Sequence, residues 1–237
     1  MTRYDAGPVI LLPAGKRIKD ASAILDEGVS LRYISAMTQP VPHPPRLVVG
    51  ISGASGVIFG VRLLETLRTL SVESHLVLSR AAEVTLTHET DLKPADVRAL
   101  ATVAYSPADI GAAIASGSFR TLGMVVAPCS VRSMGEIATG VTSSLLSRAA
   151  DVTLKERRPL VLMVRETPLH VGHLRTMTQL AEMGAVIAPP VPAFYARPRS
   201  LDDLIDHAVG RALDLFGLDS GRVRRWGEPA QPEAAGT

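Results

Sequence analysis

Short apolar runs alternate with stretches of helical periodicity from Arg46 almost to the end of the chain. Apolar runs rich in β-branched residues and bounded by turn residues are typical of buried strands. Apolar residues that recur every three or four positions are typical of amphipathic helices. The runs predict strands at 47–52, 74–79, 102–106, 122–127, 160–165 and 184–189. The spacing predicts helices at 56–70, 80–89, 93–101, 107–116, 130–156, 169–183 and 201–216.

This alternation predicts an α/β fold with a doubly wound parallel sheet, because strands alternating with helices form right-handed βαβ units. Ligands of such sheets bind beyond the carboxyl ends of the strands. Residues 1–45 lack periodicity and end in Pro42-His43-Pro44-Pro45, a sequence that disfavours regular structure. We therefore predict an N-terminal extension over 1–45, a single ligand-binding domain over 46–217 and a C-terminal tail over 218–237.

Composition narrows the function classes. A net charge of +2 gives no electrostatic basis for capturing nucleic acid. Cys129 is the only cysteine, which excludes an intrachain disulfide and fits a reducing compartment. No apolar run approaches the ~18–20 residues that span a bilayer, and the N-terminus lacks the layout of a secretory signal. We expect a cytoplasmic protein without a membrane span.

The turn after the first strand is rich in glycine and serine. The strand at 47–51 leads into Ser52-Gly53-Ala54-Ser55-Gly56, and a helix follows. Gly53 and Gly56 permit positive φ and a close backbone approach. The free amides of a helix N-terminus, together with the helix dipole, form an anion site. The turn predicts a phosphate-bearing cofactor, the alternative being a tight turn without a ligand.

The second strand ends at Ser79-Arg80 without the Asp or Glu that usually holds the ribose of NAD. Arg80 leaves an NADP enzyme open, but the missing G-x-G-x-x-G fingerprint favours a mononucleotide such as FMN. A second cradle is predicted where the strand at 122–127 meets Cys129-Ser130-Val131-Arg132-Ser133. Cys129 itself is interpreted as a small buried hydrophobe, because no base stands beside it.

Two charged residues, Arg165 and Glu166, close an otherwise apolar strand. Charges are rarely buried without a partner, so they indicate either a ligand site or pairing with neighbouring helices. Thr167 and Pro168 suit the cap and first position of the next helix. Glu166 with His170 and His173 lacks further metal ligands, and His75, His88 and His207 are equally isolated. We expect no metal site.

A stiff proline-rich loop over 188–198 carries Phe194 and Tyr195, although aromatic residues make up only 4% of the chain. Such a loop holds an apolar wall and one phenol hydroxyl at little entropic cost on binding. The alternative is that the two rings plug the sheet edge or a subunit interface.

Taken together, these blocks closely resemble the flavin prenyltransferase family (UbiX-type), including the B subunits of hydroxyarylic-acid decarboxylase systems. The resemblance runs from Arg46 to Glu228. The matching blocks are GISGASG at 50–56, HLVLS at 75–79, HET at 88–90, SGSF at 116–119, APCS at 127–130, LLSRAADVTLKERRPLVLMVRETPLH at 145–170, PPVPAFYARPRSLDD at 189–203 and RRWGE at 224–228.

The resemblance implies a flavodoxin-like, Rossmann-type FMN-binding domain in a homo-oligomer, usually a dodecamer. It implies metal-independent transfer of a dimethylallyl group from dimethylallyl phosphate to reduced FMN, with bonds at N5 and C6. The prenylated FMN then serves a partner decarboxylase, in ubiquinone biosynthesis or in aromatic-acid metabolism.

The resemblance also implies roles for individual residues. FMN would be held by Gly53, Ala54, Ser55, Ser79, Ser130, Val131, Arg132, Ser133 and Arg165. The prenyl phosphate would be held by Lys155, Tyr195 and Arg211, helped by Arg148. Glu166 would donate a proton to the departing phosphate, and Ser55 with Glu89 would manage protons near flavin N5. Fixed cations and donors are what an allylic cation needs in order to form.

The chain departs from the family in two places. Asp109-Ile110-Gly111-Ala112 stands where some members carry a Trp, which leaves the π wall to the flavin and to Phe194 or Tyr195. Val131 and Arg132 replace smaller residues. The missing Trp and the RRWGE block favour one alternative, an FMN-binding accessory B subunit of a hydroxyarylic-acid decarboxylase complex. A flavin-dependent cysteine decarboxylase is a further alternative, but its His after the first turn and its PASANT-type motif are absent.

Overall fold

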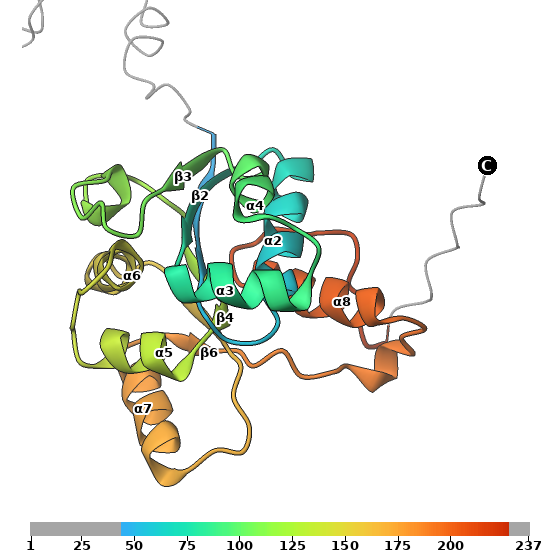
Figure 1. Ribbon diagram of the computed structural model, residues 1–237. Helices are drawn as coiled ribbons and strands as arrows, with labels where there is room; N and C mark the ends of the chain where they lie inside the picture. Colours follow the sequence, from blue (N-terminus) through green and yellow to red (C-terminus); the bar gives the residue numbers. More distant parts are fainter. Residues whose placement is uncertain (1–43, 228–237) are drawn as a thin grey trace, which may run out of the picture. The chain divides into compact units, whose positions relative to one another are not determined.

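A parallel sheet of six strands forms the centre of the domain that the structure describes (Figure 1). The computed structural model describes residues 44–227; the remainder of the predicted extension (1–43) and of the predicted tail (228–237) lies outside the described residues. All strand pairs are parallel, in the order β3-β2-β1-β4-β5-β6. The strands are β1 Arg46–Ile51, β2 Glu73–Leu78, β3 Val103–Tyr105, β4 Gly123–Cys129, β5 Leu160–Val164 and β6 Val186–Ile187.

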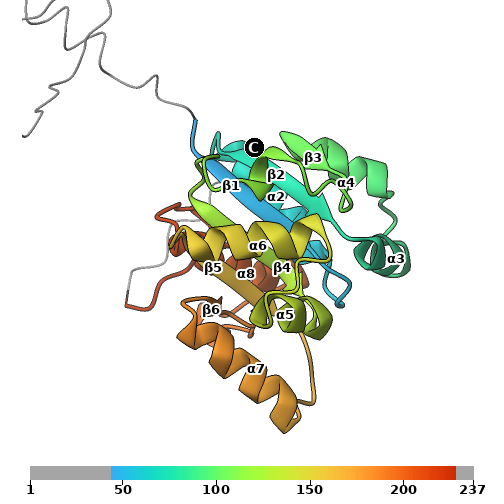
Figure 2. The ribbon, with the colours of Figure 1, turned by 90° about the vertical axis from the view of Figure 1, so that its left-hand side faces the viewer.

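Helices cover both faces of the sheet, which confirms the predicted doubly wound architecture (Figures 1 and 2). Helices α2, α4 and α8 lie on one face, and α5, α6 and α7 lie on the other. The helices are α2 Ile58–Thr69, α3 Arg80–Glu89, α4 Pro94–Leu100, α5 Val131–Ala138, α6 Leu145–Lys155, α7 Val171–Glu182 and α8 Leu201–Asp214, with short 3-10 turns η2 Ala113–Ala115 and η3 Phe194–Ala196.

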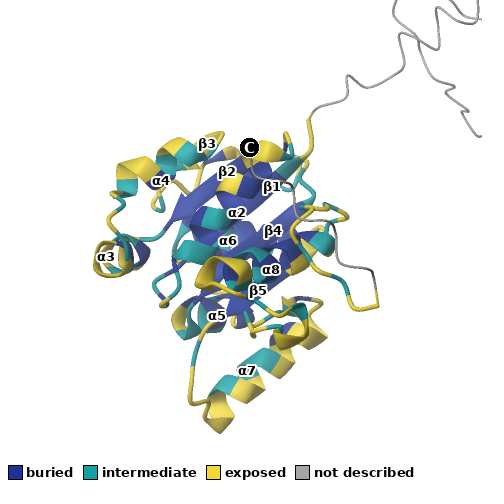
Figure 3. Cartoon of the chain, turned by 90° about the vertical axis from the view of Figure 1, so that its right-hand side faces the viewer, coloured by how far each residue is buried: buried dark blue, intermediate teal, exposed yellow. Residues whose placement is uncertain are grey.

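Alternate residues of each strand point into two separate hydrophobic cores. In β1, Val49 and Ile51 pack with α2 and α8, whereas Val48 packs with α5 and α6. This period of two explains why the central strands are apolar at almost every position, since both of their faces are buried. Figure 3 shows the buried sheet between the helices, and α7 as the most exposed of them. In α7 only Leu180 is buried.

The predicted helix over 130–156 is wrong as a single element, because the chain breaks between α5 and α6. At the end of α5, Gly140 takes a φ of 69°. Its amide donates to Ile137, and the Val141 amide donates to Glu136, which is the Schellman motif of a helix end. The Ser144 side chain then accepts from the Ser147 amide and starts α6.

Three further predictions need correction. The helix over 107–116 is reduced to η2, because the Asp109 side chain binds the Gly111 amide in a local turn that competes with a helix. Strand β6 covers only two residues of 184–189, since the prolines that follow carry no amide hydrogen. Helix α7 is capped by His170 rather than by Thr167, because the His170 ring accepts from the amides of Gly172 and His173.

The strand order places a crevice between β1 and β4, because the chain moves outward from β1 toward β3 on one side and from β4 toward β6 on the other. Ligands of open α/β sheets bind at this switch point, beyond the carboxyl ends of the strands. Among residues 44–227, no helix is long and apolar enough to cross a bilayer.

Candidate functional site

A cavity of about 370 Å³ opens at the carboxyl edge of the sheet, beside the switch point. It brings together the ends of β1, β2 and β4, as the sequence predicted. Its volume falls in the ~300–1,000 Å³ range of small-molecule sites. Its walls carry hydroxyl groups and backbone and only three charged side chains; the lining residues are Gly53, Ser79, Arg80, Ala81, Pro107, Ala108, Ser130, Arg132, Ser133, Glu136, Ser143 and Ser144.

The Ser52 hydroxyl fixes the width of the switch point. It donates to the carbonyl of Pro128 at 2.8 Å and accepts from the Ser130 amide at 2.7 Å. Ser52 is 1% exposed, so these bonds form away from water and join the ends of β1 and β4 directly. The Ser52 side chain therefore joins the first turn of the cavity to the second, beside the bond that the Ser52 amide donates to the same Pro128 carbonyl at 3.2 Å.

Two serines place the helices that face the cavity. The Ser79 hydroxyl accepts from the Ala82 amide at the start of α3, at 3.1 Å. The Ser130 hydroxyl accepts from the Ser133 amide at the start of α5, at 3.3 Å. Both serines are N-caps, which ends each strand and starts the next helix at the cavity wall.

Gly53 permits the close approach that shapes the floor of the cavity. A Cβ atom at this position would lie 2.4 Å from the Cβ of Ala81, far inside van der Waals contact. The first turn and the start of α3 therefore touch only because residue 53 has no side chain.

A carboxylate occupies the N-terminus of α2, which corrects the predicted anion site. Glu89, the last residue of α3, accepts from the Gly56 amide at 2.8 and 3.1 Å and from the Val57 amide at 3.1 Å. These are the donors that the sequence assigned to a phosphate. The hydroxyls and the other turns of the cavity are left to hold a bound group.

The remaining residues predicted to hold FMN are placed differently from one another. Arg132 lines the cavity and pairs with Glu136 at 3.0 Å, while Val131 packs against a hydrophobic core. Ala54 is buried and Ser55 is exposed in the same turn. Arg165 lies just after β5, with its amide bonded to the carbonyl of Cys129 and its side chain exposed.

Tyr195 and Arg211 meet in a second cavity of about 320 Å³, between the proline-rich loop and α8. The wall also carries His207, and its apolar part includes Met163, Pro190 and Leu215. An apolar wall with one phenol and one guanidinium suits a short apolar chain that ends in an anion. The carboxylate of Glu166 accepts from the Thr167 amide at 3.0 Å and is not part of either wall.

Arg148 and Lys155 line neither cavity within one chain. Helix α6 starts at the carboxyl-edge cavity, where Ser144 caps it, and runs back along the sheet to Lys155. There Lys155 pairs with Glu156 at 2.7 Å, and its ammonium lies near Gly117. Arg148 pairs with Asp151 at 2.8 Å. A single chain therefore leaves these two cations at a distance from Tyr195 and Arg211.

Two histidines that the sequence placed as isolated are in fact buried and bonded. His75 lies 2.9 Å from the Tyr105 hydroxyl, and His207 lies 3.1 Å from the Tyr195 hydroxyl. The Cys129 side chain is fully buried, and burial raises the pKa of its thiol to about 12. Within residues 44–227, no three His, Cys, Asp or Glu side chains come together as metal ligands.

Sequence reasoning missed several residues of the site. Ser52 lies in the turn after the first strand, and no pattern around it predicts its two hydrogen bonds to distant residues. Ser143 and Ser144 line the cavity, and two serines shortly after Gly140 are the signal for a helix break and a new cap. His207 stands four positions before Arg211, so both lie on one face of α8.

Comparisons with known proteins agree with this geometry. Residues 38–213 match the flavoprotein family. The flavin prenyltransferase UbiX of Escherichia coli (strain K12) is 62% identical over 174 residues, which cover 73% of this chain and 92% of the relative.

Two solved structures are also similar. The crystal structure of AnUbiX in complex with FMN and dimethylallyl pyrophosphate has a TM-score of 0.78 and 50% identity, covering 79% of this chain and all of that one. The dodecameric FMN-dependent UbiX-like decarboxylase from Escherichia coli O157:H7 has a TM-score of 0.75 and 48% identity, covering 77% of this chain and all of that one. From the matched residues and the shared fold, the chain belongs to the UbiX-type family of flavin prenyltransferases.

Proposed function

We propose that this chain transfers a dimethylallyl group from dimethylallyl phosphate to reduced FMN, forming bonds at flavin N5 and C6 and releasing phosphate. The observation that carries the proposal is the presence of two cavities: one at the carboxyl ends of β1, β2 and β4, lined in part by serines, and one lined by Tyr195 and Arg211. Membership of the family supplies the reaction class. A partner decarboxylase receives the prenylated flavin as its cofactor.

The carboxyl-edge cavity fits FMN. Ser79, Ser130 and Ser133 offer neutral hydroxyls, and Gly53 opens space where a side chain would intrude. Arg132 supplies positive charge at the wall of this cavity, and Arg165 is a second exposed cation, just after β5. When bound, the reduced flavin supplies the nucleophilic ring atoms of the reaction. The chain's own part is to orient the ring and to exclude water from it.

The second cavity fits the prenyl phosphate. An ionised phosphate leaves readily only when fixed donors and cations neutralise its charge. Tyr195 offers a hydroxyl and Arg211 a guanidinium from one wall, and the apolar residues opposite suit the five-carbon chain. Glu166, just beyond β5, is the acid that delivers a proton to the leaving phosphate oxygen.

The site is completed by a second copy of the chain in a homo-oligomer, which we expect to be a dodecamer. Lys155 and Arg148 lie on α6, remote from Tyr195 within one chain, and a neighbouring copy would bring them to the phosphate. The exposed apolar side chains of α7, Val171 and Leu174 among them, support such an assembly. Large exposed apolar faces mark subunit contacts.

Ser55 and Glu89 lie on either side of Gly56. The Glu89 carboxylate holds the turn by accepting from the Gly56 amide, and the Ser55 side chain is exposed in the same turn. In this arrangement Glu89 fixes the turn, and Ser55 carries protons toward flavin N5.

The variant Glu166→Gln tests the assignment of the acid. It keeps the shape and hydrogen-bonding capacity of Glu166 but delivers no carboxyl proton, so product formation in single turnover should fall about 10²–10⁴-fold. FMN affinity should stay unchanged. Arg211→Ala should instead weaken the binding of dimethylallyl phosphate first. A Glu166→Gln enzyme that works at the wild-type rate would remove the acid role, and EDTA should leave the wild-type rate unchanged.

Mixed assemblies test the shared site. Co-expression of Glu166→Gln chains with Lys155→Ala chains creates some sites with an intact Glu166 from one copy and an intact Lys155 from another. Activity should therefore recover above that of either variant alone. No recovery, with subunit mixing shown by mass spectrometry, would contradict a site that Glu166 of one copy shares with Lys155 of another.

The accessory-subunit function is the second candidate, favoured by the sequence Asp109-Ile110-Gly111-Ala112, which stands where some members of the family carry a Trp. An accessory subunit would bind FMN with the same cavity but form no prenylated flavin. A wild-type protein that holds FMN and stays inert with dimethylallyl phosphate would favour this candidate.

A further inference from the structure

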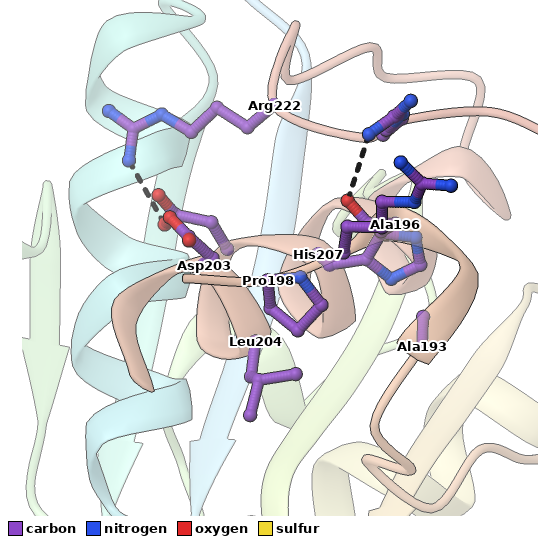
Figure 4. A pocket seen from close by; sticks show the side chains of 10 residues that line it. Ala193, Ala196, Pro198, Asp203, Leu204, His207 and Arg222 are labelled. Atoms are coloured by element: carbon purple, nitrogen blue, oxygen red, sulfur yellow. Dashed lines mark hydrogen bonds and ion pairs between the residues drawn. The ribbon is translucent and has the colours of Figure 1, made fainter. Parts of the chain in front are cut away.

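A buried histidine holds the hydroxyl of Tyr195. His207, on the inner face of α8, is 7% exposed, and its Nε2 lies 3.1 Å from the Tyr195 Oη. The two rings meet edge to face with centroids 5.6 Å apart. Figure 4 shows His207 on α8 directly beside the turn that carries Ala193 and Ala196. A tyrosine in a surface loop is thereby tied to a rigid element.

The C-terminal segment, residues 222–226, braces this pair from outside. His207 forms a hydrogen bond with the backbone of Arg224, and the Arg224 side chain donates to the carbonyl of Ala196 at 3.3 Å. The ring of Trp226 lies edge-on to Tyr195 with centroids 5.6 Å apart. The segment therefore touches both the histidine and the turn that carries the tyrosine.

An ion pair fixes the same segment to the end of α8. Arg225 donates twice to the Asp214 carboxylate, at 2.9 and 3.0 Å, and Arg211 donates to it at 2.6 Å. These contacts lower the pKa of Asp214, Arg225 being the larger cause. The Asp214 carboxylate therefore links the C-terminal segment, through Arg225, to Arg211, which lines the second cavity.

His207 is the wall between two cavities. One is the cavity of about 320 Å³ that Tyr195 and Arg211 line, and the other, of about 180 Å³, opens toward Arg222 and Arg224 (Figure 4). Arg211 follows His207 by one helical turn, so the phenol, the imidazole and the guanidinium share one wall. Nothing in the reaction proposed above requires a histidine at this wall.

We propose that His207 is a positioning residue, which holds the Tyr195 hydroxyl at the wall of the prenyl-phosphate cavity one helical turn from Arg211, with the C-terminal segment as its brace. The inference rests on the proposed function, in which Tyr195 and Arg211 bind the donor phosphate. Fixing a side chain before binding removes its ordering cost from the affinity.

The hydrogen-bonding capacity of the two groups fits this role. A phenol has one donor and two acceptor sites, so a bond in which His207 Nε2–H donates to its oxygen leaves its own proton for a phosphate oxygen. Burial lowers the pKa of His207, and the positive charge of Arg211 lowers it further. The bond to the Arg224 backbone and the negative charge of Asp214 raise it, but the net shift is downward. The bond to the Arg224 backbone raises the pKa as a carbonyl that accepts a ring proton does, so the phenol proton is free only when the ring carries a proton on Nε2 as well.

The test is a double-mutant cycle on donor binding. The dissociation constant of dimethylallyl phosphate is measured by calorimetry on the FMN-loaded wild type, Tyr195→Phe, His207→Phe and the double variant. The Tyr195→Phe variant should bind dimethylallyl phosphate about tenfold more weakly, because it loses a hydrogen bond to a charged group. The His207→Phe variant should bind it about three- to tenfold more weakly, because the Tyr195 hydroxyl is no longer held in place. The double variant should bind no more weakly than Tyr195→Phe alone, because His207 acts through the hydroxyl.

Two further variants separate positioning from a structural role. His207→Gln keeps a hydrogen-bonding group and should bind within about threefold of the wild type. His75→Phe is the control, because His75 on β2 forms a similar pair with Tyr105 on β3, its Nδ1 lying 2.9 Å from the Tyr105 hydroxyl. This variant should lower the melting temperature without changing the affinity for dimethylallyl phosphate. His207→Met replaces His207→Phe in the cycle if thermal melting shows that the phenylalanine ring prevents folding.

The outcomes are distinguishable. Wild-type affinity in folded His207→Phe, or multiplicative losses in the double variant, would overturn the positioning role alone. A wild type that binds no dimethylallyl phosphate, or a Tyr195→Phe variant that binds it as tightly as the wild type, would overturn the phosphate assignment and this inference with it.

Discussion

Replacing Ser52 by alanine tests how the site is held open at the switch point of the sheet. The hydroxyl of Ser52 makes two buried bonds, to the Pro128 carbonyl at 2.8 Å and from the Ser130 amide at 2.7 Å. The Pro128 carbonyl keeps the Ser52 amide at 3.2 Å as a partner, whereas the Ser130 amide is left without this acceptor.

The magnitude follows from these contacts. A typical buried hydrogen bond contributes about 0.5–1.5 kcal/mol, and an orphaned buried donor costs about 1–3 kcal/mol. Ser52→Ala should therefore lower the free energy of unfolding by about 2–3 kcal/mol. For a domain of this size the melting temperature should fall by about 5–10 °C. Because the orphaned amide belongs to the second turn of the cavity, FMN affinity should fall by about tenfold or more, which corresponds to roughly 1.4 kcal/mol.

Ser74→Ala is the matched control. Ser74 is also a buried serine in the same sheet, 2% exposed, and its hydroxyl accepts from the Thr102 amide at 3.1 Å. It lies near the amino end of β2, at the opposite edge from the cavity. This variant should lose about 1 kcal/mol of stability and no FMN affinity.

Urea unfolding at one protein concentration and fluorescence titration of FMN measure both quantities. If Ser52→Ala and Ser74→Ala lose equal stability and neither loses FMN affinity, the argument that Ser52 sets the cavity is refuted.

Three other predictions concern neighbouring groups. Glu89→Ala should cost about 1 kcal/mol by uncapping the Gly56 and Val57 amides, and a melting temperature equal to the wild type would show that the contact does not matter. Gly53→Ala should abolish FMN binding, as a fluorescence titration would reveal, since its Cβ would lie 2.4 Å from that of a neighbouring alanine; normal affinity would mean that the turn has room. Burial raises the pKa of the Cys129 thiol to about 12, so this thiol should resist iodoacetamide at about pH 8 until the chain is unfolded. Rapid labelling of the native protein would contradict its burial.

Much of the fold could be predicted from the sequence because the central strands are buried on both faces. An apolar run such as 122–127 is typical of a strand buried on both faces in an α/β protein. The serines that follow β2 and β4 are favoured N-cap residues, so they predict that a helix starts where each strand ends. The carboxyl-edge cavity follows from the same reasoning, since parallel strands bring their ends together.

The parts that failed depend on contacts between distant residues. Glu89 reaches the amide of Gly56 only because α3 folds back along the first turn, and no local pattern encodes that contact. The pairing of His207 with Tyr195 likewise needs the loop after β6 to return to α8. Lys155 lies away from Tyr195 because α6 and α8 cover opposite faces of the sheet. The break before α6, which Ser144 caps, was concealed by a continuous helical periodicity.

The mass of the flavin released from the wild-type protein tests the central claim most directly. The purified protein is incubated without oxygen with reduced FMN and dimethylallyl phosphate and then denatured, and the free flavin is analysed by mass spectrometry. The account predicts a flavin heavier than FMN by one dimethylallyl unit, formed by the wild type and strongly reduced in Glu166→Gln. Recovery of unmodified FMN alone from a folded, FMN-loaded wild type would contradict it.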